Sequence, residues 1–293
     1  MTDLPPLPLA RYRLEFMVEK PLHLPAYAGS TLRGAFGGAL RSSVCTTGQN
    51  TCEACPLIAA CPYAVLFETQ AIAGEGPIQA PRPYIIEPPQ WGERNYAPGE
   101  LLAFHLVLAG RALDQLALVL HAFVRAFRLG VGRGNGTARL ARVLHIGTQE
   151  TVVLEKLESA LIDHETIAPP ASTLGETVTL HFHSPLRLQD NGRRATAEEY
   201  TPRRLLMALV RRVALMHEHH GAGPLALEFS KLARQSEAIV GEKNLQWRDW
   251  SRYSNRQQQK MARGGVIGEW TFKGELAPFL PFLHLGQCLH VGK

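Results

Sequence analysis

Four of the five cysteines lie close together, with the spacing C-x6-C-x2-C-x5-C. Four thiolates within 17 residues, two of them in a CxxC, match a structural zinc site in ligand number and compactness. An iron–sulfur cluster uses the same ligands and is the alternative metal centre; a segment without metal is the third interpretation. Disulfides are rare in the cytosol. We predict a structural zinc site formed by Cys45, Cys52, Cys55 and Cys61.

Cations and aromatic rings are interspersed over residues 247–260, shortly before the pair Gly264-Gly265. Aromatic rings stack on bases, and arginine and lysine hold phosphates, so this composition is typical of a nucleic-acid-binding segment. We expect a strand followed by a loop; the four-residue spacing of the cations also fits one helix face, which is the alternative. The candidate contacts are Arg248, Arg252, Tyr253, Arg256 and Lys260, with Trp247 and Trp250 as further rings.

A third candidate is the glycine-rich stretch LGVGRGNGTAR, residues 129–139. Glycines allow a loop to approach a phosphate or a nucleic-acid backbone closely, and Arg133 and Arg139 lie in the same stretch. A tight turn without a ligand is the alternative interpretation.

The overall charge favours a polyanionic partner. The chain has 293 residues, a formal net charge of +5, and 24 arginines against 7 lysines. Arginine favours bidentate phosphate contacts, although a GC-rich genome would give the same excess. No apolar run approaches the roughly 20 residues of a membrane span, and the N-terminus lacks the basic end and apolar core of a signal peptide. We expect a cytoplasmic protein without membrane contact.

The elements that must position these residues recur in the same order in both halves. RYRLEFMV (11–18) and TVTLHFHSPLRL (177–188) alternate as strands do. An amphipathic helix follows each, capped by Ser30 in the first half and by Thr201 before Pro202 in the second. The second helix should carry a basic face, with Arg204, Arg211 and Arg212.

Later in each half, a strand, a glycine and an apolar helix lead to Leu-Gly. Each half therefore predicts a β-α-β-β-α-β unit, and the fold class is α+β with two tandem ferredoxin-like domains. Gly34, Gly37 and Gly38 indicate that another backbone comes close to the first helix. Cys288 is expected on a buried strand.

The expected boundaries follow from this repeat. The first domain covers 1–150, with a cysteine-containing insertion at about 42–100. Residues 151–172 form a linker that ends at Pro169-Pro170, and the second domain covers 173–293. The second copy stops where the first continues into its glycine-rich loop, so we expect that loop to be missing from this chain.

Three phrases carry a family resemblance: LPAYAGSTLRGAFGGALR (24–41), CPYAVLFE (61–68) and the stretch from Trp247 to Lys293. With the tandem halves, they resemble the RAMP superfamily of CRISPR-associated RNA-binding proteins, and within it the precursor-crRNA-processing endoribonucleases. The resemblance implies metal-independent cleavage of CRISPR repeat RNA, with no cofactor for catalysis, by attack of a 2′-hydroxyl that leaves a 2′,3′-cyclic phosphate. It also implies other CRISPR effector-complex proteins as partners.

The catalytic residues are the weakest part of the resemblance. Relatives often place a histidine in or just after the first helix, whereas this chain has none between His23 and His105. The remaining candidates near that helix are His23 and Tyr27, with Arg33 and Arg41 on its exposed face to stabilise the phosphorane. In MHEHHG (216–221), protonated histidines at a helix C-terminus would complement the helix dipole.

Two other functions compete with the endoribonuclease. The departure near the first helix favours a non-catalytic RNA-binding subunit of a CRISPR ribonucleoprotein. The cysteine segment could instead dock another protein, with RNA binding secondary.

Overall fold

The computed structural model describes residues 4–68, 80–154, 176–190, 193–254 and 259–292. The chain divides into two compact units. The N-terminal unit comprises residues 7–169 with 219–222, and the C-terminal unit comprises residues 1–6, 170–218 and 223–293. None of the described helices is both long and apolar enough to cross a membrane.

The N-terminal unit is built on a five-stranded antiparallel sheet in the order β3-β5-β1-β6-β7. The chain passes through β1, α1, β3, β5, α3 and β6 in turn, which is the β-α-β-β-α-β order of a ferredoxin-like domain. The elements are β1 (Leu9–Val18), α1 (Gly29–Val44), β3 (Tyr84–Glu87), β5 (Leu101–Ala109), α3 (Leu116–Leu129), β6 (Ala138–His145) and β7 (Thr151–Leu154).

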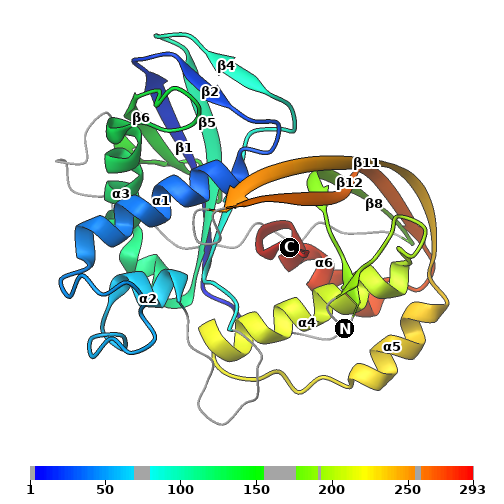
Figure 1. Cartoon of the computed structure of the whole chain (residues 1–293). Helices are drawn as coiled ribbons and strands as arrows, with labels where there is room; N and C mark the ends of the chain where they lie inside the picture. Colours follow the sequence, from blue (N-terminus) through cyan, green and yellow to red (C-terminus); the bar gives the residue numbers. More distant parts are fainter. Residues whose placement is uncertain (1–3, 69–79, 155–175, 191–192, 255–258, 293) are drawn as a thin grey trace. The chain divides into compact units, whose positions relative to one another are not determined.

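Helices α1 and α3 cover one face of this sheet (Figure 1). Alternation along β1 places Tyr12, Leu14 and Phe16 on the covered face, where all three are buried. Phe36 of α1 stacks on Phe123 of α3, with ring centroids 4.6 Å apart and an angle of 7° between the ring planes. The sequence pattern of this core is thus confirmed.

Two expectations for α1 were wrong. Its N-cap is Ala28, which makes no side-chain capping hydrogen bond, and Ser30 lies inside the first turn. A Cβ at Gly37 would lie 2.7 Å from the ring of Phe67, which belongs to α2 (Pro62–Phe67), so a side chain and not a backbone approaches this helix. Gly34 and Gly38 have nothing within 4 Å of a Cβ.

The expected domain limits also differ from the structure. Strand β3 is an integral strand of the sheet, yet it lies within the range 42–100 that was expected to be an insertion. Strand β7 pairs with β6, so the sheet continues past residue 150 into the expected linker. Two further short strands, β2 (Leu22–Leu24) and β4 (Arg94–Tyr96), pair with each other, and the 3-10 helix η1 (Gly110–Gln115) precedes α3.

The C-terminal unit repeats most of this order around a three-stranded sheet, β11-β12-β8. Its main elements are β8 (Thr177–Leu186), α4 (Pro202–His220), β11 (Val240–Ser254), β12 (Gln259–Lys273) and α6 (Leu280–Leu289). Smaller elements are β9 (Gln189–Asp190), β10 (Arg193–Arg194), α5 (Phe229–Glu237) and η2 (Ala277–Phe279). The expected Thr201 cap is confirmed, because its hydroxyl accepts a hydrogen bond from the Arg204 N–H at 3.2 Å.

Cys288 was expected on a strand, but it is a buried residue of α6. After α6 the chain lies next to the end of β8. A Cβ on Gly292 would lie 2.8 Å from the carbonyl oxygen of Arg187, the residue that follows this strand. In the N-terminal unit the last helix, α3, is likewise followed by chain next to the first strand, where β6 pairs with β1. The two units therefore share one plan, a tandem ferredoxin-like fold.

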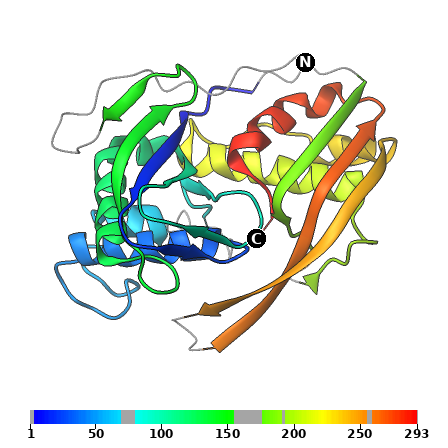
Figure 2. The same ribbon diagram turned by 90° about the horizontal axis from the view of Figure 1, so that it is seen from above.

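Strands β11 and β12 form a long hairpin, in which Val240 pairs with Lys273 and Ser254 with Gln259 (Figure 2). The strand interpretation of this segment is confirmed, and the helical alternative is wrong. Strand β8 pairs with β12 only from Val266 to Lys273, so the distal part of the hairpin extends beyond the third strand.

Candidate nucleic-acid interface

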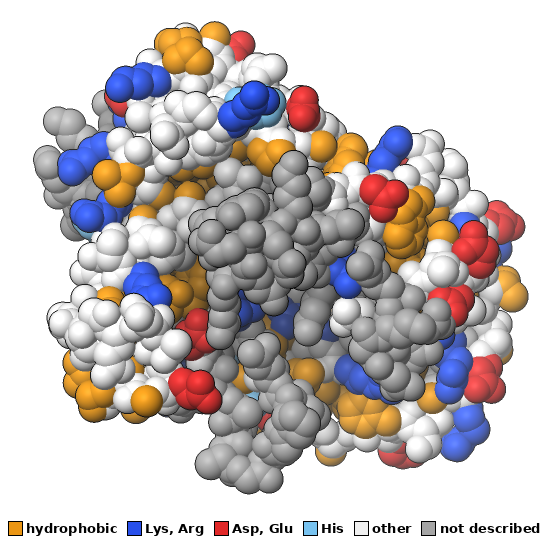
Figure 3. All heavy atoms as spheres, viewed as in Figure 1, with side chains coloured by type: hydrophobic (Ala, Val, Ile, Leu, Met, Phe, Trp, Pro, Cys, Tyr) orange, Lys and Arg blue, Asp and Glu red, His pale blue; other side chains and the backbone are white. Residues whose placement is uncertain are grey.

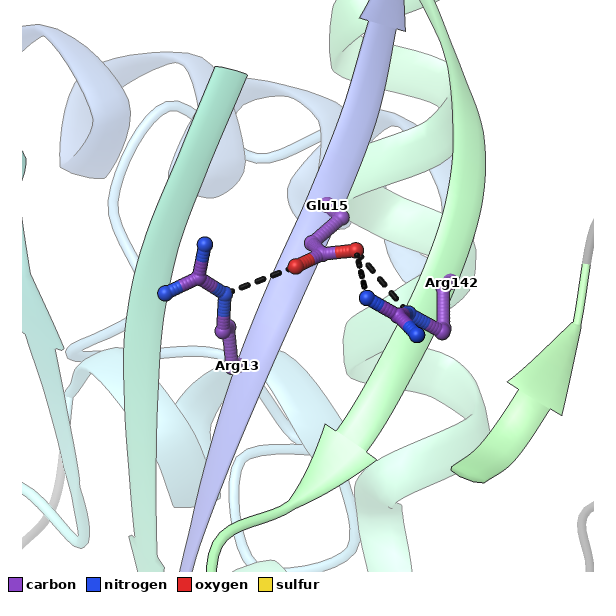
Figure 4. A network of polar contacts seen from close by, with 3 residues as sticks. All are labelled: Arg13, Glu15 and Arg142. Carbon is purple, nitrogen blue, oxygen red and sulfur yellow. Dashed lines mark hydrogen bonds and ion pairs between the residues drawn. The ribbon is translucent and has the colours of Figure 1, made fainter. Parts of the chain in front are cut away.

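The open face of the N-terminal sheet carries ion pairs (Figure 4). The Glu15 carboxylate accepts hydrogen bonds from Arg13 Nε at 2.7 Å and from Arg142 Nε at 2.9 Å. Burial of Glu15 opposes its ionisation, but the hydrogen bonds and charges of Arg13 and Arg142 outweigh burial and hold the pKa of Glu15 below its ordinary value. Both guanidiniums are therefore engaged within the sheet.

A second ion pair lies on the same face. Arg11 Nη2 contacts Glu87 Oε2 at 2.6 Å, and His105 Nδ1 lies 3.9 Å from the same oxygen. Burial and the charge of Arg11 lower the pKa of His105 against the effect of Glu87, so this imidazole is neutral near pH 7. Arg11, Arg13 and Arg142 of this sheet thus have carboxylate partners. Arg139 on β6 is an exposed arginine of the same sheet.

The glycine-rich loop packs against strand β2. His23 forms an isolated antiparallel bridge with Arg133, and Val131 forms one with Gly136. A Cβ on Gly132 would overlap the carbonyl oxygen of His23, and one on Gly136 would lie 2.5 Å from the Cα of Leu22. These two glycines are explained by packing on protein backbone, whereas the side chain of Arg133 between them is exposed.

Strand pairing gathers three polar side chains around His23. His23 is paired with Asn95 on β4 and bridged to Arg133 on its other side. Directly paired residues of neighbouring strands point to the same face, so His23 lies between Asn95 and Arg133 on one surface. His23 Nδ1 is 2.6 Å from Asn95 Oδ1. An N–H at Nδ1 donates to this oxygen and leaves the lone pair of Nε2 available.

Sequence reasoning found His23 and Arg133 but missed Asn95. It lies 72 residues from His23 along the chain, and its strand has only three residues. The neighbouring Arg94, also exposed on β4, was missed for the same reason. No local pattern in the sequence signals this pairing.

The other catalytic candidates have packing contacts. The ring of Tyr27 lies against Gly29 at the start of α1, 2.9 Å from where a Cβ would stand. The Arg33 guanidinium lies 6.0 Å from the centre of the Phe67 ring. Arg41 donates to the carbonyls of Gln49 and Asn50 and lies 5.8 Å from the centre of the Tyr63 ring. Both arginines are partly exposed, and each has a contact within the N-terminal unit.

In the C-terminal unit, the expected basic face of α4 is reduced to Arg211, which is exposed. Arg204 is half-buried. Arg212 donates from Nε to the carbonyl oxygen of Leu289 at 3.3 Å, and burial lowers its pKa to about 10. Arg212 therefore contacts the last residue of α6 and is not available to a ligand in this conformation.

The cluster at 216–221 marks a helix C-terminus, as expected, because α4 ends at His220. His217 is buried, and burial lowers its pKa, so the expected protonation is wrong for this residue. His220 Nε2 lies 2.6 Å from the carbonyl oxygen of Pro81. Neither residue supports a catalytic interpretation of the cluster.

The two tryptophans of β11, Trp247 and Trp250, lie on opposite faces of the hairpin formed by β11 and β12. Trp247 donates from Nε1 to Asp249 Oδ1 at 2.8 Å, and a Cβ on Gly264 would overlap the indole ring. Gly264 is thus required by a tryptophan on its own face. A Cβ on Gly265 would instead lie 2.6 Å from the carbonyl oxygen of Leu186 on β8.

The opposite face of the hairpin carries a stripe of cationic and aromatic residues. Arg248 is exposed and donates to Gln246 Oε1 at 2.6 Å. Alternation along β11 places Arg248 and Trp250 on this face. We call these two residues the hairpin stripe. In the backbone register Trp250 pairs with Arg263, Arg252 with Met261 and Tyr253 with Lys260, and Arg256 lies outside the described residues.

Lys and Arg side chains are spread over the face of the molecule in Figure 3, interspersed with Asp and Glu. The four clustered cysteines line one pocket of the N-terminal unit and carry free thiols.

Comparisons with known proteins agree with this architecture. Residues 7–167 match the family model AF_1859_N, described as an N-terminal domain. Residues 180–293 match the family model CRISPR_Cas6, described as CRISPR-associated endoribonuclease Cas6. A search of curated proteins found no match.

Solved structures share the fold over nearly the whole chain. Thermus thermophilus Cas6 (TTHB231), in a product complex, matches with a TM-score of 0.56 and 20% identity, covering 97% of this chain and 95% of that one. The product complex of Cas6 (TTHA0078) matches with a TM-score of 0.51 and 20% identity, covering 97% and 93%. A chain of a Cas6-RT-Cas1--Cas2 complex matches with 0.55 and 14% identity, covering 98% of this chain and 27% of that one.

Proposed function

We propose that this chain, whose residues 180–293 match the family model of the CRISPR-associated endoribonuclease Cas6, is an enzyme of that kind and cuts precursor CRISPR RNA within its repeats. The observation that carries the proposal is the arrangement of His23 between Asn95 and Arg133. A ring nitrogen with a lone pair next to an exposed guanidinium supplies the base and the cation that RNA cleavage needs.

The proposed reaction uses the RNA's own 2′-hydroxyl as nucleophile. His23 Nε2 takes the proton of this hydroxyl as the oxygen bonds to the adjacent phosphorus. The bond from phosphorus to the 5′-oxygen breaks, and that oxygen takes up a proton; Tyr27 is the candidate donor. The products are a 2′,3′-cyclic phosphate and a 5′-hydroxyl. Arg133 stabilises the negative charge of the phosphorane, the role first assigned to Arg33 and Arg41.

In this proposal the hairpin stripe holds the RNA. The Arg248 guanidinium contacts a phosphate, and Trp250 on the same face stacks on an unpaired base. Arg139 and Arg211 are exposed and provide further phosphate contacts. The match to the endoribonuclease family model and the product complexes of TTHB231 and TTHA0078 support this proposal, and the Cas6-RT-Cas1--Cas2 complex supports partnership with other CRISPR proteins. We place this activity in the cytoplasm.

The proposal is tested with end-labelled repeat RNA from the CRISPR array of the source organism, in the presence of EDTA. We expect one cut, a 2′,3′-cyclic phosphate end, and no cut when the nucleotide before the scissile phosphate carries a 2′-deoxy sugar. A metal requirement or a 3′-hydroxyl product would refute the mechanism. Tight binding without cleavage would instead identify a non-catalytic RNA-binding subunit.

A further inference from the structure

The cysteine segment, residues 45–61, contains no helix or strand and has no buried side chain. Five of its residues are partly shielded from solvent, and the other twelve are exposed. The five are Cys45, Cys52, Cys55, Ile58 and Cys61. The segment therefore has almost nothing but thiols to serve as a core, too little apolar area to hold a compact loop of this length.

All four thiols line a single pocket of about 170 Å³. Thr47 Oγ1 lies 3.9 Å from Cys45 Sγ and 3.6 Å from Cys55 Sγ, so this hydroxyl connects the two thiols. The N–H of Cys55 donates to the carbonyl of Cys52 at 3.1 Å, which closes the CxxC into a turn. That turn directs both of its thiols toward the pocket.

The ends of the segment are fixed by regular structure. Cys45 is the C-cap of α1, and Cys61 is the N-cap of α2. Arg41, one turn earlier in α1, donates to the carbonyls of Gln49 and Asn50. Two ligand positions are therefore preset by helices, and two lie on the loop between them.

We infer that Cys45, Cys52, Cys55 and Cys61 bind one structural zinc ion, which replaces the missing apolar core of the segment. Four thiolates suit tetrahedral zinc, and the closed ligand set leaves no open position for catalysis. No three potential ligands among the described residues already converge on one point. Binding therefore draws the sulfurs inward across the pocket and couples metal affinity to local folding.

The first test is metal analysis of the purified full-length protein with the variants Cys52→Ser and Cys55→Ser. We expect one zinc per chain in the unmodified protein and loss of most of it in both variants. Cys288→Ala is the matched control, because Cys288 belongs to α6 of the C-terminal unit, and it should keep its zinc. Zinc-free protein, or zinc retained by both segment variants, would overturn the inference.

A second measurement does not depend on the variants folding. Cobalt(II) added to the metal-free protein should give the sulfur-to-cobalt charge-transfer and visible bands of a tetrahedral thiolate site. Chelation of the metal should increase hydrogen exchange in residues 45–61. Iron with labile sulfide would assign a cluster in place of zinc, and the absence of free thiols before reduction would assign disulfides; either result overturns the zinc site. Metal content is independent of RNA cleavage, so this test and that of the proposed function fail separately.

Discussion

At the scale of the residue, Asn95 determines which nitrogen of His23 is free to act. The 2.6 Å contact between His23 Nδ1 and Asn95 Oδ1 fixes the orientation of the imidazole. Asn95→Ala should lower the single-turnover cleavage rate about 10- to 100-fold through misplacement of the base, with unchanged RNA affinity. Asn95→Asp keeps an acceptor oxygen and should recover part of the rate. Equal rates for Asn95→Ala and the unmodified protein would refute the positioning role.

What the sequence reveals at this scale depends on how local the interaction is. His23 and Arg133 were identified from residue type and proximity to a helix or a glycine-rich loop. The contacts of Arg33 with Phe67 and of Arg41 with the loop at Gln49 could not be predicted, because helical periodicity shows which face a residue occupies but not what lies against that face.

At the scale of the element, the glycine-rich loop is defined by its contact with β2. Gly132 and Gly134 both have positive φ, +74° and +87°, but only a Cβ on Gly132 would overlap the carbonyl of His23. Gly134→Ala should cost about 1–2 kcal/mol for its backbone conformation. Gly132→Ala should cost a further 1–3 kcal/mol, roughly, for overpacking, and should also impair cleavage. Thermal unfolding of the two variants measures the difference; equal shifts would show that this packing is unimportant.

The ion pairs of β1 give the N-terminal sheet a dependence on pH. The depressed pKa of Glu15 means that its ionised form stabilises the fold. This contribution is complete above the ordinary value of 4.5 and is lost as the pH falls through the lower folded value. Glu15→Gln should cost about 1–3 kcal/mol at neutral pH, and the deficit should shrink below about pH 4.5.

Urea unfolding at a series of pH values measures that deficit. Glu19→Gln, at an exposed residue next to β1, is the control and should change little. A deficit for Glu15→Gln that is the same at every pH would show that charge on Glu15 is not its source.

Long elements with clear periodicity could be predicted, and short ones could not. Strand β1 and helices α1, α3 and α4 each bury one face over many residues, and β8 alternates between exposed and less exposed residues, so their patterns are visible in the sequence. Strands β2, β3 and β4 have three or four residues each. Their pairing partners, not their own sequence, make them strands, which explains why β3 was taken for part of an insertion.

At the scale of the whole molecule, the net charge of +5 implies salt-dependent RNA binding. Each phosphate contact on a single strand contributes about 0.7 to the slope of log affinity against log salt concentration. Arg248→Gln should weaken binding and reduce that slope by about 0.7. Arg234→Gln removes an exposed arginine from α5 in the same unit and should leave the slope unchanged. Equal slopes for all three proteins would place the RNA elsewhere than on the hairpin stripe.

The tandem plan could be predicted because both halves place strands, helices and glycines in the same order. Family-specific phrases in the sequence suggested a function, but the surface that we propose to act on RNA could not be predicted from the sequence. It depends on strand register, which pairs Trp250 with Arg263 and His23 with Asn95 across the sheets.

The most direct test of the account is the single-turnover cleavage rate of His23→Ala on repeat RNA, with RNA affinity measured in parallel. His121→Ala, at an exposed position of α3, is the matched control. The account predicts that His23→Ala lowers the rate about 10²- to 10⁴-fold, the usual contribution of a general base, while its affinity and the control's rate remain unchanged. An undiminished rate in His23→Ala would contradict the central claim that this histidine is the base.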